Sequence, residues 1–367
     1  AKLRFEEHSF PGFYTIKRTV RQYPRKIGGN LLGNLGEVND NDIKRGGGEY
    51  KMGDYIGRSG LERAYEKYLR GKDGVKILER DAHGAIKASY MDGMFDTLPT
   101  PGKKITSTID VRLQAFAEEL MEGKIGAVVA IEPATGEILV MASAPTFDPD
   151  DMVGSDRGNN YMRMLNDPKK PMFNRAVQAK YPPGSTFKLV QGLIGLQEGV
   201  LTPANAYPCH GGYHYGSKKM GCHPHASPLD LRNAVAQSCN AYFCWGLHRM
   251  FGSSKYEGGT KEAMNVWRDY MVSMGFGYKL GVDLPGEVRG MIPNAQFYDK
   301  AYRSSWNGLT VISISIGQGE VTLTPLQIAN LGATTANRGY YITPHIVKGI
   351  EGEPIDSLYT TPTHTMV

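Results

Sequence analysis

The order of strand-like and helical segments constrains the fold of this chain more than any other feature of its sequence. Two strand-like runs, at 126–131 and 137–142, are joined by a short turn that ends at Gly136, which predicts a β-hairpin. A block of helical patterns follows, and the apolar run at 309–316 predicts one more buried strand. Strands, then helices, then a strand indicate an α+β domain in which helices flank an antiparallel sheet.

Residues 1–104 have a different character. They are rich in glycine, tyrosine and charge, with short strand-like pieces such as Phe13–Val20 and one amphipathic helix expected at Gly60–Leu69. The sequence Leu-Pro-Thr-Pro-Gly at 98–102 is typical of a domain boundary. We therefore predict an elongated, β-rich N-terminal pedestal at 1–104 and an α+β domain at 105–367.

Composition excludes some classes of function. The chain has 367 residues, 41% of them hydrophobic and 22% charged, which is ordinary for a globular protein with a real core. The net charge is only +5 and no run of lysine or arginine exceeds two residues, so nucleic-acid binding is not indicated. The longest apolar stretch, near Ile125–Ile131, is too short to cross a bilayer.

The segment Tyr181–Lys188 places a hydroxyl and an amine at a predicted helix start. Two prolines and a glycine precede Ser185, and an apolar-periodic run follows Lys188, so both side chains lie on one face of the first turn. A serine nucleophile, an amine that can take its proton and free N–H groups for an oxyanion are what acyl transfer requires. An exposed helix start is the alternative, because Ser-x-x-Lys occurs about once by chance in such a chain.

A second polar pair is expected at Ser238-Cys239-Asn240. Side chains at i and i+2 after a helix tend to point the same way, so we expect Ser238 and Asn240 to face one cavity and Cys239 to face away from it. The Ser-x-Asn pattern also occurs at 305–307. We favour Ser238 because an apolar segment that would fix its position follows directly.

The order of these motifs resembles the penicillin-recognising serine acyltransferases. Further segments are similar to class B penicillin-binding proteins, and most of all to the elongation-type members. They are 126–149, 181–188, Leu284–Glu287 and Gly317–Gln327 in the second domain, and Phe10–Gly12, Arg21–Pro24 and Gly53–Glu62 in the pedestal.

The resemblance implies a peptidoglycan D,D-transpeptidase. Ser185 would be acylated by the penultimate D-alanine of a stem peptide, with Lys188 as the general base. Ser238 and Asn240 would move protons and hold the substrate. The acyl group would then pass to the amine of a neighbouring stem peptide, and β-lactams would trap Ser185 in the same way.

One motif of the family is missing from this chain, and the resemblance also implies a segment and partners outside it. The family's third motif, Lys-Thr-Gly, is absent, and we expect it beyond Val367; a catalytically inactive relative is the alternative. A single N-terminal membrane anchor outside this chain and an extracytoplasmic location are implied. So are a rod-shape glycosyltransferase and other elongation proteins as partners through the pedestal.

Cysteine and histidine spacing predicts a structural zinc site. Three thiols and an imidazole in a Cys-x12-Cys-x2-His-x13-Cys pattern match a Cys3His set, at Cys209, Cys222, His225 and Cys239. Related elongation-type enzymes have a metal site of two Asp, one His and one Cys in this region. The ion would lie behind Ser238 and Asn240, so its loss should disorder that motif. Two disulfides, buried free thiols, and His210 or His223 as the ligand remain alternatives.

Two other functions compete with the transpeptidase. A β-lactamase would use the same nucleophile with water as the acceptor, but the large first domain argues against it. A non-catalytic scaffold would retain the pedestal for partner binding, and a missing Lys-Thr-Gly motif would favour it.

Overall fold

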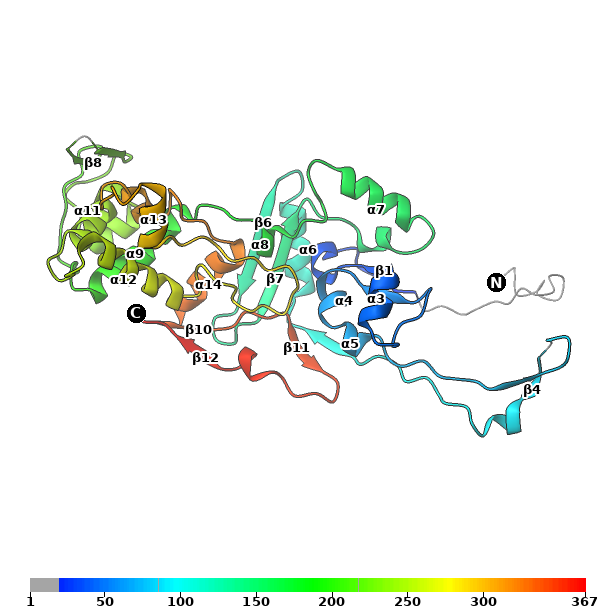
Figure 1. Cartoon of the computed structure of the whole chain (residues 1–367). Coiled ribbons are helices and arrows are strands. Elements are labelled where there is room, and N and C mark those ends of the chain that lie inside the picture. Colours follow the sequence, from blue (N-terminus) through cyan, green and yellow to red (C-terminus); the bar gives the residue numbers. More distant parts are fainter. Residues whose placement is uncertain (1–19, 85, 217) are drawn as a thin grey trace.

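The computed structural model describes residues 20–84, 86–216 and 218–367, so the strand expected at Phe13–Val20 lies almost wholly outside the described residues. The pedestal lies at one end of an elongated molecule, a sheet with its helices lies in the middle, and a helical lobe forms the other end (Figure 1). None of the helices within the described residues has the length and apolarity needed to cross a membrane.

The pedestal combines short strands with short helices. β1 (Leu35–Glu37) pairs antiparallel with β2 (Tyr55–Gly57). β3 (Leu78–Arg80) and β4 (Ile86–Ser89) form an arm that projects from the body (Figure 1). The remaining elements are α2 (Gly29–Leu32), α3 (Asp40–Arg45), α4 (Gly60–Ala64), α5 (Glu66–Leu69) and η2 (Tyr90–Gly93).

The prediction of one continuous helix at Gly60–Leu69 is wrong. The helix is divided at Tyr65, whose φ of −114° and ψ of 19° are not helical. The Tyr65 hydroxyl donates to Asp283 Oδ2 at 2.6 Å, so this tyrosine is held by a residue far along the chain. A tertiary contact here overrides the local amphipathic pattern.

The predicted hairpin is present as β6 (Gly126–Ile131) and β7 (Ile138–Ala144). Gly136 has a φ of 76°, and a Cβ there would lie 2.8 Å from the carbonyl oxygen of Ile342, so the turn requires glycine. Two more antiparallel pairs lie nearby: β5 (Ile105–Ser107) with β11 (Val347–Ile350), and β10 (Tyr340–Ile342) with β12 (Pro362–His364).

Helices cover both faces of the β6–β7 hairpin. On one face, Val140 and Ala142 pack with α6 (Val111–Leu120), whose N-terminus is capped by the side chain of Asp110. On the other face, Met141 packs with residues of α8 (Arg175–Gln178) and α14 (Pro325–Ala336). Alternate residues of one strand thus enter two separate cores, as the pleat of a strand dictates. The predicted α+β architecture is confirmed.

The helical lobe has the largest core, in which Phe187, Trp267 and Phe276 are fully buried. It contains η4 (Gly184–Phe187), α9 (Lys188–Gln197), the hairpin of β8 (Gly212–Tyr215) and β9 (Lys218–Gly221), α10 (Leu231–Ala236), α11 (Asn240–Phe251), α12 (Gly259–Ser273), α13 (Ala295–Ala301) and η5 (Ile312–Ile316). Outside the lobe are η3 (Pro149–Met152), α7 (Arg157–Asn166) and η6 (Ser357–Tyr359).

The strand predicted at 309–316 is wrong, because this run contains the 3-10 helix η5. Its isoleucines alternate with serines, which resembles a half-buried strand. Ile314 and Ser315 are both fully buried, however. The Ser315 hydroxyl bonds the carbonyl of Ile312 at 2.7 Å and lies 3.3 Å from Cys244 Sγ, so the polar position is satisfied inside the core instead of facing solvent.

Candidate active site

Main-chain packing positions the candidate nucleophile. Ser185 lies in η4, directly before α9, and its side chain is exposed. The Gly184 N–H donates to the carbonyl of Gly317 at 3.0 Å. A Cβ on Gly317 would lie 2.4 Å from the Gly184 carbonyl oxygen, and Gly317 has a φ of 68°. Only glycine at 317 therefore allows the loop after η5 to approach the nucleophile segment this closely.

Lys188 begins α9 and is 98% buried, with a relative exposure of 2%. Its Nζ lies 2.6 Å from the Ser238 carbonyl oxygen, 2.9 Å from Ser238 Oγ and 2.6 Å from Asn240 Oδ1. Burial lowers the pKa of Lys188, against the opposing effect of nearby cysteines, which favours the neutral amine that a base requires. Among the described residues, Ser185 Oγ has no hydrogen-bond partner.

Ser238 and Asn240 both contact Lys188, so the two side chains converge on one group. Ser238 has a φ of 49°, a left-handed conformation that turns the chain sharply between α10 and α11. Cys239, between them, is buried and caps α11, its Sγ accepting from Tyr242 N at 3.4 Å. The second Ser-x-Asn pattern, at 305–307, makes no hydrogen bond with Lys188 in the described part of the chain.

The four residues predicted to bind zinc lie together. One ligand atom from each of Cys209, Cys222, His225 and Cys239 lies within 4.8 Å of all the others. Zinc–sulfur bonds of about 2.3 Å in a tetrahedron place sulfur atoms about 3.8 Å apart, so this set needs little movement to close around an ion. His225 Nδ1 contacts the Ala226 carbonyl at 2.7 Å and its Nε2 lies 3.4 Å from Cys222 Sγ, so the ring is oriented toward the thiols.

The other candidates in this region have different surroundings. Cys244 is fully buried beside Ser315, as expected of a core thiol. His223 Nδ1 lies 4.0 Å from Cys222 Sγ and is not one of the four converging residues, and neither is His210. All four cysteines are free thiols in the structure.

The thiol cluster is joined directly to the candidate catalytic residues. The backbone N–H of Asn240 donates to Cys222 Sγ at 3.2 Å, and its side-chain amide donates to the Gly221 carbonyl at 2.8 Å. Burial alone would raise the pKa of the Cys222 thiol, but hydrogen bonds, of which those from Asn240 and His225 are the largest, together lower it. The β9 end of the β8–β9 hairpin therefore orients the amide that contacts Lys188.

Two family models of penicillin-binding protein domains match this chain. The family model of the penicillin binding protein transpeptidase domain matches residues 126–366, and that of the penicillin-binding protein dimerisation domain matches residues 1–107. The chain belongs to the penicillin-binding protein transpeptidase family.

Named relatives of this penicillin-binding protein are peptidoglycan D,D-transpeptidases. It is 35% identical to peptidoglycan D,D-transpeptidase MrdA of Acinetobacter baumannii over 362 residues, which cover 96% of this chain and 51% of the relative. It is 30% identical to peptidoglycan D,D-transpeptidase PbpA of Mycolicibacterium smegmatis, over 86% of this chain and 60% of the relative. The chain thus spans about half the length of the curated relatives it matches.

Solved structures show the same fold. Pseudomonas aeruginosa PBP2 in complex with WCK 5153 matches with a TM-score of 0.76 and 30% identity, over 96% of this chain and 72% of that chain. A complex between PBP2 and MreC from Helicobacter pylori matches with a TM-score of 0.80 and 26% identity, over 98% of this chain and 65% of that chain. The resemblance to elongation-type members of the family is confirmed.

Sequence reasoning missed one residue that supports the site of this penicillin-binding protein. Gln191, buried in α9, donates to the Ile314 carbonyl at 3.2 Å and accepts from Trp267 Nε1 at 3.1 Å, so it connects α9 to η5 and α12. Gly184 and Gly317 are in backbone contact through the hydrogen bond described above. Nothing in the sequence marks Gln191, whereas Gly317 lies in a segment already similar to the family.

Proposed function

We propose that this chain is part of a peptidoglycan D,D-transpeptidase that crosslinks stem peptides during cell elongation. The observation that carries the proposal is the set of three oxygen atoms around Lys188 Nζ, supplied by Ser238 and Asn240. A neutral amine has two N–H groups and one lone pair. Two of the oxygens can accept its hydrogens, and the Ser238 hydroxyl can donate to its lone pair, so a proton can pass between Ser238 and Lys188.

The proposed reaction has two acyl transfers. Ser185 Oγ attacks the carbonyl carbon of the penultimate D-alanine while its proton passes to Lys188, and the carbonyl electrons move onto oxygen. Collapse of this oxyanion breaks the C–N bond, and the leaving D-alanine takes the proton. The amine of a second stem peptide then attacks the ester carbonyl carbon and gives a proton to Lys188. The C–O bond to Ser185 breaks, and Ser185 Oγ takes a proton back from Lys188.

Penicillin labelling tests this function. Ser185→Ala should abolish covalent labelling by a fluorescent penicillin, because the ester can form only at that hydroxyl. Ser254→Ala, at an exposed loop serine, is the control and should label like the wild type. Persistent labelling of wild type favours the transpeptidase, rapid release of the label favours a β-lactamase, and no labelling favours a non-catalytic scaffold.

We also propose that Cys209, Cys222, His225 and Cys239 bind a structural zinc ion. Their convergence supports the proposal, and a Cys3His set is a standard closed zinc site. When bound, the ion would hold the β8–β9 hairpin against the start of α11. The N–H of Asn240 would then keep its thiolate acceptor, and the amide would keep its orientation toward Lys188.

Location and partners are proposed from the family relationship. We place the chain outside the cytoplasm, held by an N-terminal membrane anchor. β-Lactams, a rod-shape glycosyltransferase and other elongation proteins are the proposed ligands and partners, the proteins docking on the pedestal. The Helicobacter pylori PBP2 structure in complex with MreC supports this assignment by analogy.

A further inference from the structure

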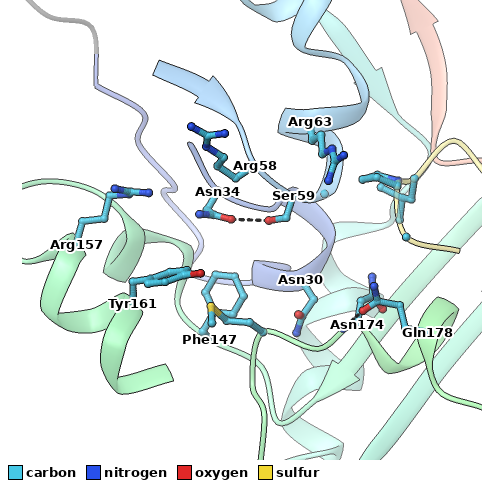
Figure 2. A pocket seen from close by; sticks show the side chains of 15 residues that line it. Asn30, Asn34, Arg58, Ser59, Arg63, Phe147, Arg157, Tyr161, Asn174 and Gln178 are labelled. Carbon is cyan, nitrogen blue, oxygen red and sulfur yellow. Dashed lines mark hydrogen bonds between the residues drawn. The ribbon is translucent and has the colours of Figure 1, made fainter. Parts of the chain in front are cut away.

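A cavity of about 450 Å³ lies where the pedestal meets the rest of the molecule (Figure 2). It brings together two segments that sequence analysis singled out and that the catalytic site does not use. Arg58 and Ser59 belong to the first, and Pro285 belongs to the second. Ser185 is not among its lining residues, so this is a separate site.

The cavity is strongly basic. Three arginines line it: Arg58 and Arg63 from the pedestal, and Arg157 from α7 on the facing side (Figure 2). None of its lining residues, all of which lie in the described part of the chain, is acidic. Like charges around a concave, partly dehydrated surface attract and concentrate anions.

Two of the three guanidinium groups are not neutralised. Arg58 pairs with Asp42, which is not among the lining residues, at 2.7 Å. Arg157 Nε donates to the Leu35 carbonyl at 3.0 Å, and neither Arg157 nor the exposed Arg63 has an ion pair among the described residues. Arginine side chains without an ion pair are suited to bidentate pairing with a carboxylate.

The absence of a side chain at Gly36 lets two of these cations approach each other. A Cβ at this position would lie 2.8 Å from Arg58 Nε and 3.0 Å from Arg157 Nη2. The two guanidinium groups therefore converge on one region, where Asp42 balances only one charge. A bound anion would relieve the remaining repulsion.

Neutral polar groups complete the lining. Asn34, Asn174 and Gln178 present amides, and the Ser59 hydroxyl donates to Asn34 Oδ1 at 2.5 Å (Figure 2). Asn30, with a relative exposure of 9%, also lines the cavity; its Nδ2 donates to the Pro171 carbonyl at 2.9 Å, and its Oδ1 is buried without a partner, a condition that only Asn330 shares in the described residues. Amide acceptors beside arginines match a ligand that carries both N–H donors and carboxylates.

We propose that this cavity binds a short acidic peptide. Its volume lies within the roughly 300–1,000 Å³ range of ligand pockets. Because both domains line the cavity, bound peptide would also hold the pedestal against the transpeptidase domain. The inference goes beyond the proposed function, since it does not involve the Ser185 site.

Calorimetric titration of this protein with acetylated triglutamate tests the proposal, with acetylated triglutamine and inorganic phosphate as comparison probes. We expect saturable binding of triglutamate, and no binding of the neutral peptide. Arg63→Gln should weaken binding about tenfold, since it removes one charge-assisted contact, and it breaks no ion pair or hydrogen bond of the described structure. Arg112→Gln, an exposed arginine on α6 with the same change in charge, should bind like the wild type.

Three results would overturn the proposal: no saturable binding of triglutamate, equal binding of phosphate, or equal weakening by Arg63→Gln and Arg112→Gln. Circular dichroism of each variant checks that the fold is intact, and this readout does not depend on the proposed function at Ser185. A parallel titration with a cell-wall disaccharide that carries a stem peptide with carboxylates identifies the natural source of the acidic peptide. Tighter binding than triglutamate assigns the site to the cell wall, and weaker binding assigns it to an acidic protein segment.

Discussion

Replacing Asn240 by aspartate should inactivate Lys188 as a base. The change is nearly isosteric and places a carboxylate where Asn240 Oδ1 lies, 2.6 Å from Lys188 Nζ. Two unit charges at 2.6 Å attract by roughly 6 kcal/mol at an effective dielectric constant of about 20. Because Asn240 is only half-buried, we discount this by half, to about 3 kcal/mol. That energy stabilises the ammonium form and lowers the neutral fraction about 100-fold.

Acylation by a chromogenic or fluorescent penicillin measures the consequence. Asn240→Asp should acylate about 100-fold more slowly than Asn240→Ala near neutral pH. Both variants lose the hydrogen bond from the side-chain amide to Gly221; they differ in the added charge and in the oxygen that accepts from Lys188, which only the aspartate keeps. The aspartate raises the pKa of Lys188, so the rate of Asn240→Asp should recover as the pH rises, at higher pH than in Asn240→Ala.

The reasoning would be refuted by equal acylation rates of the two variants across the whole pH range. That outcome would mean that Lys188 is not the base, or that its charge does not depend on residue 240. A loss of soluble, cooperatively folding protein in Asn240→Asp alone would be detected by circular dichroism, and Ser238→Ala would then test the same proton path without adding charge.

The remaining predictions concern the metal and the backbone. Purified protein should contain about one zinc per chain, lost in Cys222→Ser and retained in Cys244→Ser; elemental analysis that finds no zinc, with two disulfides by mass, would remove the metal site. Gly317→Ala should lower the free energy of unfolding by about 2 kcal/mol or more, because its Cβ would meet the Gly184 carbonyl at 2.4 Å. Gly332→Ala is the control, because Gly332 lies on the exposed side of α14 and a Cβ there meets nothing within 4 Å. This change should raise the free energy of unfolding by about 1 kcal/mol at most. Urea titration measures both variants, and equal effects would contradict this account.

Local patterns predicted much of the candidate site. Ser238 and Asn240 were expected to share a cavity because residues two apart after a helix point the same way, and both contact Lys188. The spacing of Cys222 and His225 was expected to bring sulfur and imidazole together, and these atoms lie 3.4 Å apart. These arrangements depend on residues that are close in the sequence, so the spacing of the residues is enough to predict that their side chains lie together.

Features that depend on distant segments were not predictable. The 309–316 run was predicted as a strand, because alternation alone cannot show that Ser315 finds its partners inside the core. The helix at Gly60–Leu69 is divided by a contact with Asp283, more than two hundred residues away. The arginines around the junction cavity, Arg58 and Arg157, come from different domains, and no sequence pattern brings them together.

The contact between Gly184 and Gly317 limits which substitutions the segment that carries Ser185 can accept. The segment that carries Ser185 is held by a hydrogen bond between two peptide groups, the N–H of Gly184 and the carbonyl of Gly317, and a side-chain substitution does not replace a peptide group. Changing the side chains nearby leaves this backbone hydrogen bond in place. Gly184 and Gly317 both have positive φ, so replacing either glycine would lower the stability of the fold at the segment that carries Ser185.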